Sequence, residues 1–195
     1  MDGFHLANVA LTSLGLAERK GALETFDAAG FAALLARIRA EGPDTVWAPT
    51  YDRSVEESIA GAIPVPPGTE VVVSEGNYLL VDEGPWAQVG ELLDEVWAVR
   101  VDAAIRTERL IARHVRYGRT PAEAAAWVAS VDEPNAAVIR ATLGRADLDV
   151  STGGGNGTRH TMRACRRRGS RRSWPAVPAP SATTSTTSRV ASGWW

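Results

Sequence analysis

A carboxylate at residue 75 is the first candidate for chemistry in this sequence. In the stretch VVVSEGNYLL, a β-branched run ends at Glu75. Such a run is typical of a strand buried on both faces of a parallel sheet, and ligands bind at the C-terminal edge of these sheets. Glu75 could therefore hold Mg²⁺ directly or through water, because Mg²⁺ prefers oxygen ligands and keeps several waters. Taken alone, a glutamate that simply ends a strand is the better interpretation.

Four arginines after EVWAVRVD form a second candidate. They are spaced three, four and three residues apart, at Arg106, Arg109, Arg113 and Arg116. In a helix this spacing places all four on or near one face. The planar guanidinium suits phosphate oxygens, so the row could close over a nucleotide. The alternative is a solvated helix face paired with Glu108 or Glu123, which is the usual role of a charged row.

Polar residues nearer the start of the chain form a third group. The chain opens MDGFHL, a stretch typical of a strand end that runs into a functional loop. Lys20 is the single lysine of the sequence, and it could contact an anionic substrate or be merely exposed. Tyr51-Asp52-Arg53 is a polar cluster after a short predicted strand. Each of these signals is weak alone.

The composition excludes several classes of protein. The 195 residues are 45% apolar and 23% charged, which is ordinary for one globular domain with or without a tail. No run of about eighteen apolar residues occurs, so no membrane span is expected. The acidic N-terminus does not resemble a signal peptide. The single cysteine, Cys165, cannot form an intrachain disulfide and fits a reducing, cytoplasmic location.

The charge divides the chain into two parts. Every Asp and Glu lies at or before Asp149, whereas residues 151–195 contain no acidic residue, Leu, Ile, Lys, Phe or Tyr. Because the aliphatic content of this Arg/Ser/Thr/Pro-rich tail is too low to form a core, we expect it to be disordered or non-native. Residues 1–150 are the expected folded domain.

Periodicity and capping signals predict alternating strands and helices in this domain. Asp27 and Gly42 are the expected start and stop of one helix, and Thr120 with Glu123 forms the capping box of another. The other predicted elements are strands at DTVWAP, EVVVSEG and EVWAVRV, helices over 86–93 and 103–117, and a last helix from Asp132 or Asn135. This alternation predicts an α/β fold, with a three-layer parallel sheet and flanking helices.

The order of the motifs carries a resemblance that no single motif does. MDGFHL, RKGALETFDAAGF, APTYDR, VVVSEGNYLL and RTERLIARHVRYG resemble, in this order, the nucleoside/nucleotide kinase family of P-loop proteins. The resemblance is to uridine kinase-like, phosphoribulokinase-like and pantothenate kinase-like enzymes, including those described as fructose-transport-system kinases. It covers roughly residues 1–150. It implies an ATP- and Mg²⁺-dependent phosphotransferase that acts on a hydroxyl of a nucleoside, sugar or related metabolite.

The resemblance also implies roles for individual residues. Asp2 would lie near the acceptor hydroxyl and Mg²⁺ and accept the hydroxyl proton, and Glu75 would be the second carboxylate at the metal. Arg113 would act in a lid over ATP, with Arg109 and Arg116 beside it. The residues expected to line the acceptor pocket are His5, Lys20, Tyr51, Arg53 and Asn135. A homodimer is compatible with this family assignment, and no membrane partner is expected.

The phosphate-binding loop of this family is missing from the printed sequence. The loop G-x-x-x-x-G-K-[ST] precedes Asp-Gly-Phe-His in the family and holds the β- and γ-phosphates, and no such motif occurs here. GGGNGTRH, from Gly153, lacks the Gly-Lys-Ser/Thr step. We therefore expect Met1 to be a late start that leaves out the first strand and the loop, so a catalytically inactive fragment or binding remnant is the alternative function.

The tail has two interpretations. A sequence rich in Arg, Ser, Thr and Pro without Leu or Lys is what a GC-rich gene yields out of frame, and we expect a frameshift after about residue 150. The rival is a genuine basic tail that binds nucleic acid through arginine contacts and tryptophan stacking. Nucleic acid is the less favoured partner, because RACRRRGSRR is short and the tryptophans are not interleaved with it.

Overall fold

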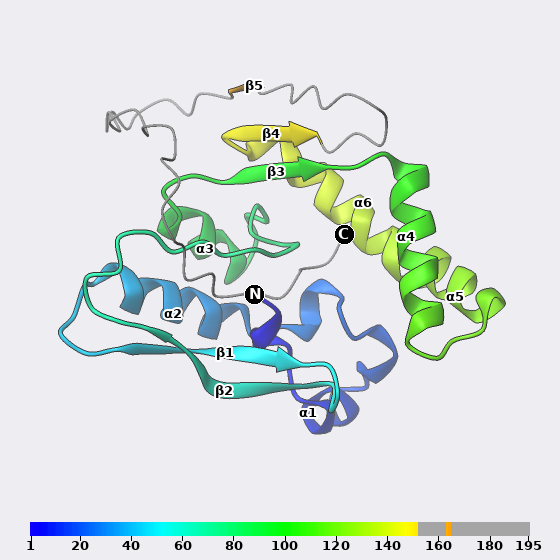
Figure 1. Cartoon of the computed structure of the whole chain (residues 1–195), viewed down its shortest axis with the longest axis horizontal. Coiled ribbons are helices and arrows are strands. Elements are labelled where there is room, and N and C mark those ends of the chain that lie inside the picture. The colour runs from blue at the N-terminus through cyan, green and yellow to red at the C-terminus, as the bar shows by residue number, and fades with distance from the viewer. Residues whose placement is uncertain (152–162, 165–195) are drawn as a thin grey trace, which may run out of the picture.

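The strands in the part of the chain that the structure describes form two small sheets (Figure 1). The computed structural model describes residues 1–151 and 163–164, so most of the predicted tail, with its Gly153 motif, lies outside the described residues. One sheet pairs β1 (Val46–Asp52) with β2 (Glu57–Val65) in antiparallel fashion. In the other, β3 (Trp97–Arg100) runs parallel to β4 (Leu148–Ser151), and β4 pairs antiparallel with β5 (Arg163–Ala164).

The helices begin where the capping signals predict. Their bounds are α1 Asn8–Ser13, α2 Ala28–Arg39, α3 Trp86–Leu92, α4 Ala103–Arg116, α5 Pro121–Trp127 and α6 Glu133–Thr142. The Asp27 carboxylate accepts a hydrogen bond of 2.8 Å from the Gly30 amide, which caps α2. Thr120 and Glu123 form the reciprocal capping box of α5. The predicted helices over 86–93 and 103–117 correspond to α3 and α4, and they are confirmed within one residue of each end.

Short helical turns complete the chain. They are η1 Asp2–Phe4, η2 Ala17–Arg19, η3 Leu23–Thr25, η5 Leu143–Arg145 and a single π-helical turn, η4 Val128–Asp132. The π turn connects α5 directly to α6, so these helices continue from one to the next. No helix in the described part of the chain is both long and apolar enough to cross a membrane.

The core lies where α2 packs against α3 (Figure 1). Phe31 from α2, Trp86 from α3 and Tyr78 from the intervening chain are all buried. The rings of Tyr78 and Trp86 have centroids 5.7 Å apart, and the Tyr78 hydroxyl donates a 2.8 Å hydrogen bond to the Gly21 carbonyl. This bond satisfies the polar end of a fully buried ring and connects the core to the segment that carries Lys20.

The predicted three-layer parallel sheet is not present in the described residues. The stretch EVVVSEG, expected to be a buried central strand, has no strand structure, and Val71 and Val73 are 67% and 89% exposed. A β-branched run forms a strand only when neighbouring strands accept its hydrogen bonds, and none pairs with residues 70–74 here. The mixed α/β character is confirmed, whereas the large parallel sheet is a wrong prediction for this chain as described.

The first residues are held from three directions. The Asp27 amide donates to the Phe4 carbonyl at 2.8 Å, and the Leu6 amide donates to the Thr25 carbonyl at 2.9 Å. Gly3 lies so close to the Pro49 carbonyl of β1 that a Cβ atom would collide with it. Only glycine fits this approach, which gives the Asp-Gly-Phe-His stretch a structural reason for its glycine.

Candidate functional site

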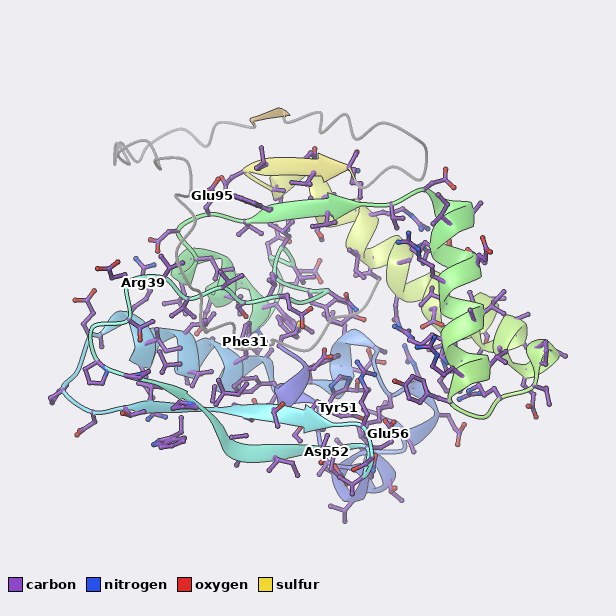
Figure 2. All side chains as sticks on the ribbon, in the orientation of Figure 1. Phe31, Arg39, Tyr51, Asp52, Glu56 and Glu95 are labelled. Atoms are coloured by element: carbon purple, nitrogen blue, oxygen red, sulfur yellow. The ribbon has the colours of Figure 1, made fainter. Side chains whose placement is uncertain are left out.

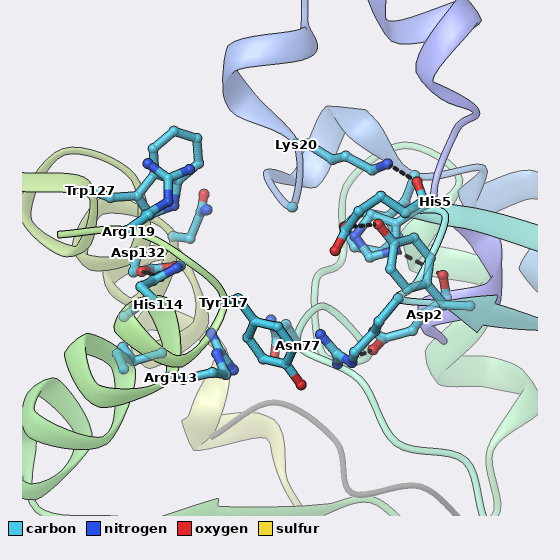
Figure 3. A pocket seen from close by; sticks show the side chains of 18 of the residues that line it. Asp2, His5, Lys20, Asn77, Arg113, His114, Tyr117, Arg119, Trp127 and Asp132 are labelled. Atoms are coloured by element: carbon cyan, nitrogen blue, oxygen red, sulfur yellow. Dashed lines mark hydrogen bonds and ion pairs between the residues drawn. The ribbon is translucent and has the colours of Figure 1, made fainter. Parts of the chain in front are cut away.

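A cavity of about 460 Å³ opens between the N-terminal segment and the helices α4 to α6 (Figure 3). One wall comes from η1, the segment around Lys20 and the β1–β2 turn, and the other from α4, α5, η4 and α6. Its polar lining residues are Asp2, His5, Asn8, Lys20, Tyr51, Arg53, Glu56, Asn77, Arg106, Arg113, His114, Tyr117, Arg119, Trp127, Asp132 and Asn135. Five of these are arginine or lysine and three are carboxylates, so the lining carries an excess of positive charge.

Asp2 is held at the cavity by the β1–β2 turn and by its own backbone. Arg53 Nη2 lies 3.7 Å from Asp2 Oδ2, and the Asp2 side chain keeps 21% of its surface exposed. The Asp2 carbonyl oxygen is 2.8 Å from His5 Nδ1. The carboxylate therefore faces solvent and the cavity from a fixed turn.

His5 is a buried part of the same wall. Its ring lies between Phe26, at a centroid distance of 4.0 Å, and Tyr51, at 4.8 Å, and is tilted by 42° and 46° to their planes. Burial lowers the pKa of His5 below its ordinary value of 6.5, although the hydrogen bond to Asp2 acts in the opposite direction. Folding therefore favours the neutral ring of His5 over the charged one.

Lys20 is fixed by the β1–β2 turn. Its Nζ donates hydrogen bonds to Asn8 Oδ1 at 2.6 Å and to the Glu56 carbonyl at 2.5 Å, and it lies 5.3 Å from the centre of the Tyr51 ring. Glu56 has a positive φ of 54°, which is unusual for a residue with a side chain and turns its carbonyl toward Lys20. The Tyr51 hydroxyl donates to Glu56 Oε2 at 2.6 Å, and both side chains lie at the β1–β2 turn (Figure 2). Burial, together with that bond, raises the pKa of Tyr51 above its ordinary value of 10.

The opposite wall is tied together by two contacts between its helices. Arg106, on α4, forms a short ion pair with Glu133 at the start of α6. His114, also on α4, has its Nε2 2.8 Å from Asp132 Oδ2 at the end of η4. Beyond them, the Arg119 guanidinium lies 3.9 Å above the centre of the Trp127 ring, a cation–π contact.

The four-arginine row of α4 is divided between two faces. Arg106 and Arg113 line the cavity, whereas Arg109 and Arg116 are exposed and do not. Residues seven apart in a helix point in nearly the same direction, as Arg106 and Arg113 do. The pair Arg109 and Arg116 is turned by about 60° around the helix axis from that direction. Arg109 and Arg116 therefore do not line the cavity with Arg113, and their expected place beside it over the nucleotide stays a prediction. Burial lowers the pKa of Arg113, as expected for a guanidinium on the inner face.

Glu75 lies beside the cavity but does not line it. The Met1 amino group donates a 2.5 Å hydrogen bond to the Glu75 carbonyl, so this residue is packed against the chain start. Desolvation raises the pKa of Glu75 above 4.5, and the Asp2 charge adds to this effect while the Met1 ammonium opposes it. The two carboxyl groups are thus close enough to interact, although Glu75 does not end a strand as predicted.

The predicted acceptor residues do come together. The cavity is lined by Asp2, His5, Lys20, Tyr51, Arg53, Arg113 and Asn135, and not by Glu75, Arg109 or Arg116. Sequence reasoning missed Asn8, Glu56, Asn77, His114, Tyr117, Arg119, Trp127 and Asp132. Tyr117 could have been found, because it lies four residues after Arg113 and therefore shares its side of α4.

Comparison with known proteins finds several relatives of this chain. No family model matches the sequence. The chain is 38% identical over 134 residues to the ATP-dependent kinase-like protein notR' of Aspergillus versicolor, which covers 65% of this chain and 77% of that protein. It is 36% identical over 150 residues to the uncharacterised protein YggC of Escherichia coli K12, covering 77% of this chain and 61% of YggC.

Two solved structures share the fold. A candidate fructose transport system kinase from Silicibacter sp. TM1040 superposes with a TM-score of 0.67 at 38% identity, over 73% of this chain and 68% of that one. YFH7 of Saccharomyces cerevisiae, titled a P-loop-containing kinase with a circular permutation, superposes with a TM-score of 0.66 at 22% identity, over 80% of this chain and 57% of that one. At these identities and coverages, the chain belongs to the P-loop kinase family.

Proposed function

We propose that the protein has the family role of an ATP-dependent small-molecule kinase, which transfers the γ-phosphoryl group to a hydroxyl of a nucleoside, sugar or related metabolite. One observation carries this proposal: the Asp2 carboxylate and the Arg113 guanidinium line the same cavity from opposite walls. A proton acceptor on one side and a cation on the other are what phosphoryl transfer to a hydroxyl requires. The single cysteine favours a cytoplasmic location for this activity.

Asp2 has the central role in the proposed chemistry. Its carboxylate would orient the acceptor hydroxyl and take its proton as the new P–O bond forms. Arg53, 3.7 Å away, would keep the carboxylate in place. His5, Lys20, Tyr51 and Asn135 would bind the rest of the acceptor, because they line the same cavity.

The nucleotide side would be formed by α4. Arg113 would lie against the phosphates, and Arg119, held over Trp127, would be the next cation along this wall. Bound Mg·ATP supplies the phosphoryl group and a cation that neutralises its charge. No group of three His, Cys, Asp or Glu side chains among the described residues is arranged to hold a metal. A single Asp2 oxygen still fits Mg²⁺, because that ion keeps several waters and binds the phosphates of its nucleotide. Glu75 does not line the cavity, so it would contact this Mg²⁺ through water.

Turnover of an Asp2 variant tests this role. The chain would be fused behind a G-x-x-x-x-G-K-[ST] segment of a P-loop kinase, and ADP release would be measured with a panel of hydroxylated metabolites. Loss of a general base lowers turnover by about 10²–10⁴-fold. We expect Asp2→Asn to do so while Mg·ATP affinity changes little, because Asp2 acts on the acceptor proton.

A matched control is available on the surface. Asp44 is exposed and does not line the cavity, so Asp44→Asn should retain full turnover. Equal loss in both variants, or a loss of ATP affinity that accounts for the whole effect of Asp2→Asn, would remove Asp2 from its proposed role.

A binding remnant is the second candidate function. It is favoured by the absence of a G-x-x-x-x-G-K-[ST] motif from the 195 residues. Such a protein would retain the acceptor wall and bind metabolites without transferring phosphate. Metabolite binding by the fused chain without any ADP release would favour it.

A further inference from the structure

We propose that the molecule bound in this cavity carries an anionic group, a carboxylate or a phosphate, and that Lys20 binds this group. The inference deepens the proposed function and rests on it, because it names the class of acceptor that the cavity would take. It distinguishes a charged metabolite from a neutral sugar or nucleoside.

Lys20 has one donor left for a ligand. An ammonium group has three N–H donors and no acceptor. Two of the donors are used, by Asn8 Oδ1 at 2.6 Å and by the Glu56 carbonyl at 2.5 Å. Both acceptors are uncharged, so the positive charge is oriented by them and not neutralised.

Two other cations of the cavity differ from Lys20 in this respect. Arg53 lies 3.7 Å from Asp2, and Arg106 is paired with Glu133. Within the described part of the chain, Lys20 forms no ion pair with a carboxylate. An ammonium group that is oriented by neutral acceptors and forms no ion pair can make a charge-assisted hydrogen bond to an anionic ligand.

The position of Lys20 assigns it to the acceptor. It lies on the same wall as Asp2, His5 and Tyr51, whereas Arg113 and Arg119 lie across the cavity on the helical wall (Figure 3). An acceptor whose hydroxyl reaches Asp2 would therefore have its charged end near Lys20. The Tyr51 ring, 5.3 Å from Lys20 Nζ, holds the ammonium on this side.

Binding of paired probes to residues 1–195 tests the proposal without any phosphoryl transfer. The pairs are ribose 5-phosphate with ribose, for a phosphate, and glycerate with glycerol, for a carboxylate. Affinities would be measured by titration calorimetry or ligand-observed NMR. A charge-assisted hydrogen bond changes affinity by about ten- to a hundredfold, and we expect at least one charged probe to bind that much more tightly than its neutral partner.

Three variants separate the Lys20 charge from general effects. Lys20→Met keeps the apolar stem and should abolish the preference for the charged probe, and Lys20→Arg should restore much of it. Arg19→Met removes a positive charge from the adjacent residue, which is exposed and paired with Glu24 instead of lining the cavity. This control should leave the preference intact, and melting curves would establish that all three variants fold.

The outcomes distinguish this inference from the proposed function. Charged probes that bind no better than neutral ones overturn it, as does an equal effect of Lys20→Met and Arg19→Met. A loss of Mg·ATP affinity in Lys20→Met that matches the loss for the probe assigns Lys20 to the nucleotide and also overturns it. If the Lys20-dependent preference is found but the fused chain transfers no phosphate, anion recognition stands and the kinase proposal fails.

Discussion

His114 and Asp132 are joined across the helical wall of the cavity by a contact of 2.8 Å between Nε2 and Oδ2. Their side chains are only 15% and 14% exposed, although both are polar. The contact connects α4 to the last residue of the π-helical turn η4, which continues into α6. This pair therefore holds α4 against the segment that follows α5.

The first prediction is that this contact stabilises α5, because it joins α4 to the turn that follows α5. Asp132→Asn and His114→Phe should each speed amide exchange in α5 by about tenfold or more, because a bond to a charged group is lost in a partly buried place. Exchange in α2 should not change. Mass spectrometry or NMR would follow both segments.

A double variant and a surface variant complete this test. The combined effect of Asp132→Asn and His114→Phe should be smaller than the sum of the single effects, because both remove the same contact. Arg109→Gln alters an exposed residue of α4 and should leave α5 unaffected. Additive effects in the double variant would contradict the proposed coupling.

Local signals predicted the helices of this protein well. The cap of α2 depends on Asp27 and the amide of Gly30, and the capping box of α5 on Thr120 and Glu123, all within three residues. The strand expected at EVVVSEG depends instead on partners far away in the chain. Because the described residues provide no such partner, its valines remain exposed, and local sequence could not reveal this.

The site was predictable in its residue types more than in its geometry. The motif order predicted Asp2, Lys20 and Arg53 at one site, and all three line the same cavity. The spacing of the arginine row did not reveal that Arg109 points away, because a row of four spans more than one face of a helix. His114 and Asp132 come into contact because of the turn between α5 and α6, and no motif in the sequence predicted this turn.

The second prediction concerns the two faces of α4. In the chain fused to a phosphate-binding segment, Arg113→Ala should lower turnover about tenfold or more, because Arg113 lines the cavity opposite Asp2. Arg116→Ala removes the same charge from the exposed face and should change turnover less than about twofold. Steady-state kinetics with saturating acceptor would compare them. Equal losses would mean that the outer row also reaches the nucleotide.

The third prediction is a pH dependence of stability that comes from His5. Burial lowers the pKa of His5 in the folded protein below 6.5, so the unfolded chain takes up its proton at higher pH. The contribution of neutral His5 is fully present above pH 6.5 and is lost as the pH falls through the folded-state pKa. Urea unfolding from pH 8 to pH 5 would measure this loss.

Two variants isolate the His5 contribution. His5→Phe keeps the ring between Phe26 and Tyr51, and His5→Gln removes the ring but stays polar. Both should flatten the fall in the free energy of unfolding below pH 6.5, whatever their effect at pH 8. A wild-type slope in both variants would mean that other groups cause the dependence.

The last prediction concerns residues 1–195 on their own. Without a G-x-x-x-x-G-K-[ST] loop, this polypeptide lacks the nest of amide donors and the lysine that bind the β- and γ-phosphates in the family. Bonds of this kind contribute roughly 1.5–3 kcal/mol each, so the absence of several weakens binding by orders of magnitude. Arg113 cannot replace them, because a lid stabilises only a nucleotide that is already held beneath it. We therefore expect at best weak Mg·ATP binding by calorimetry and no detectable turnover, with both gained on fusion to the loop segment. Micromolar affinity of the unfused chain would show that the cavity cations alone suffice.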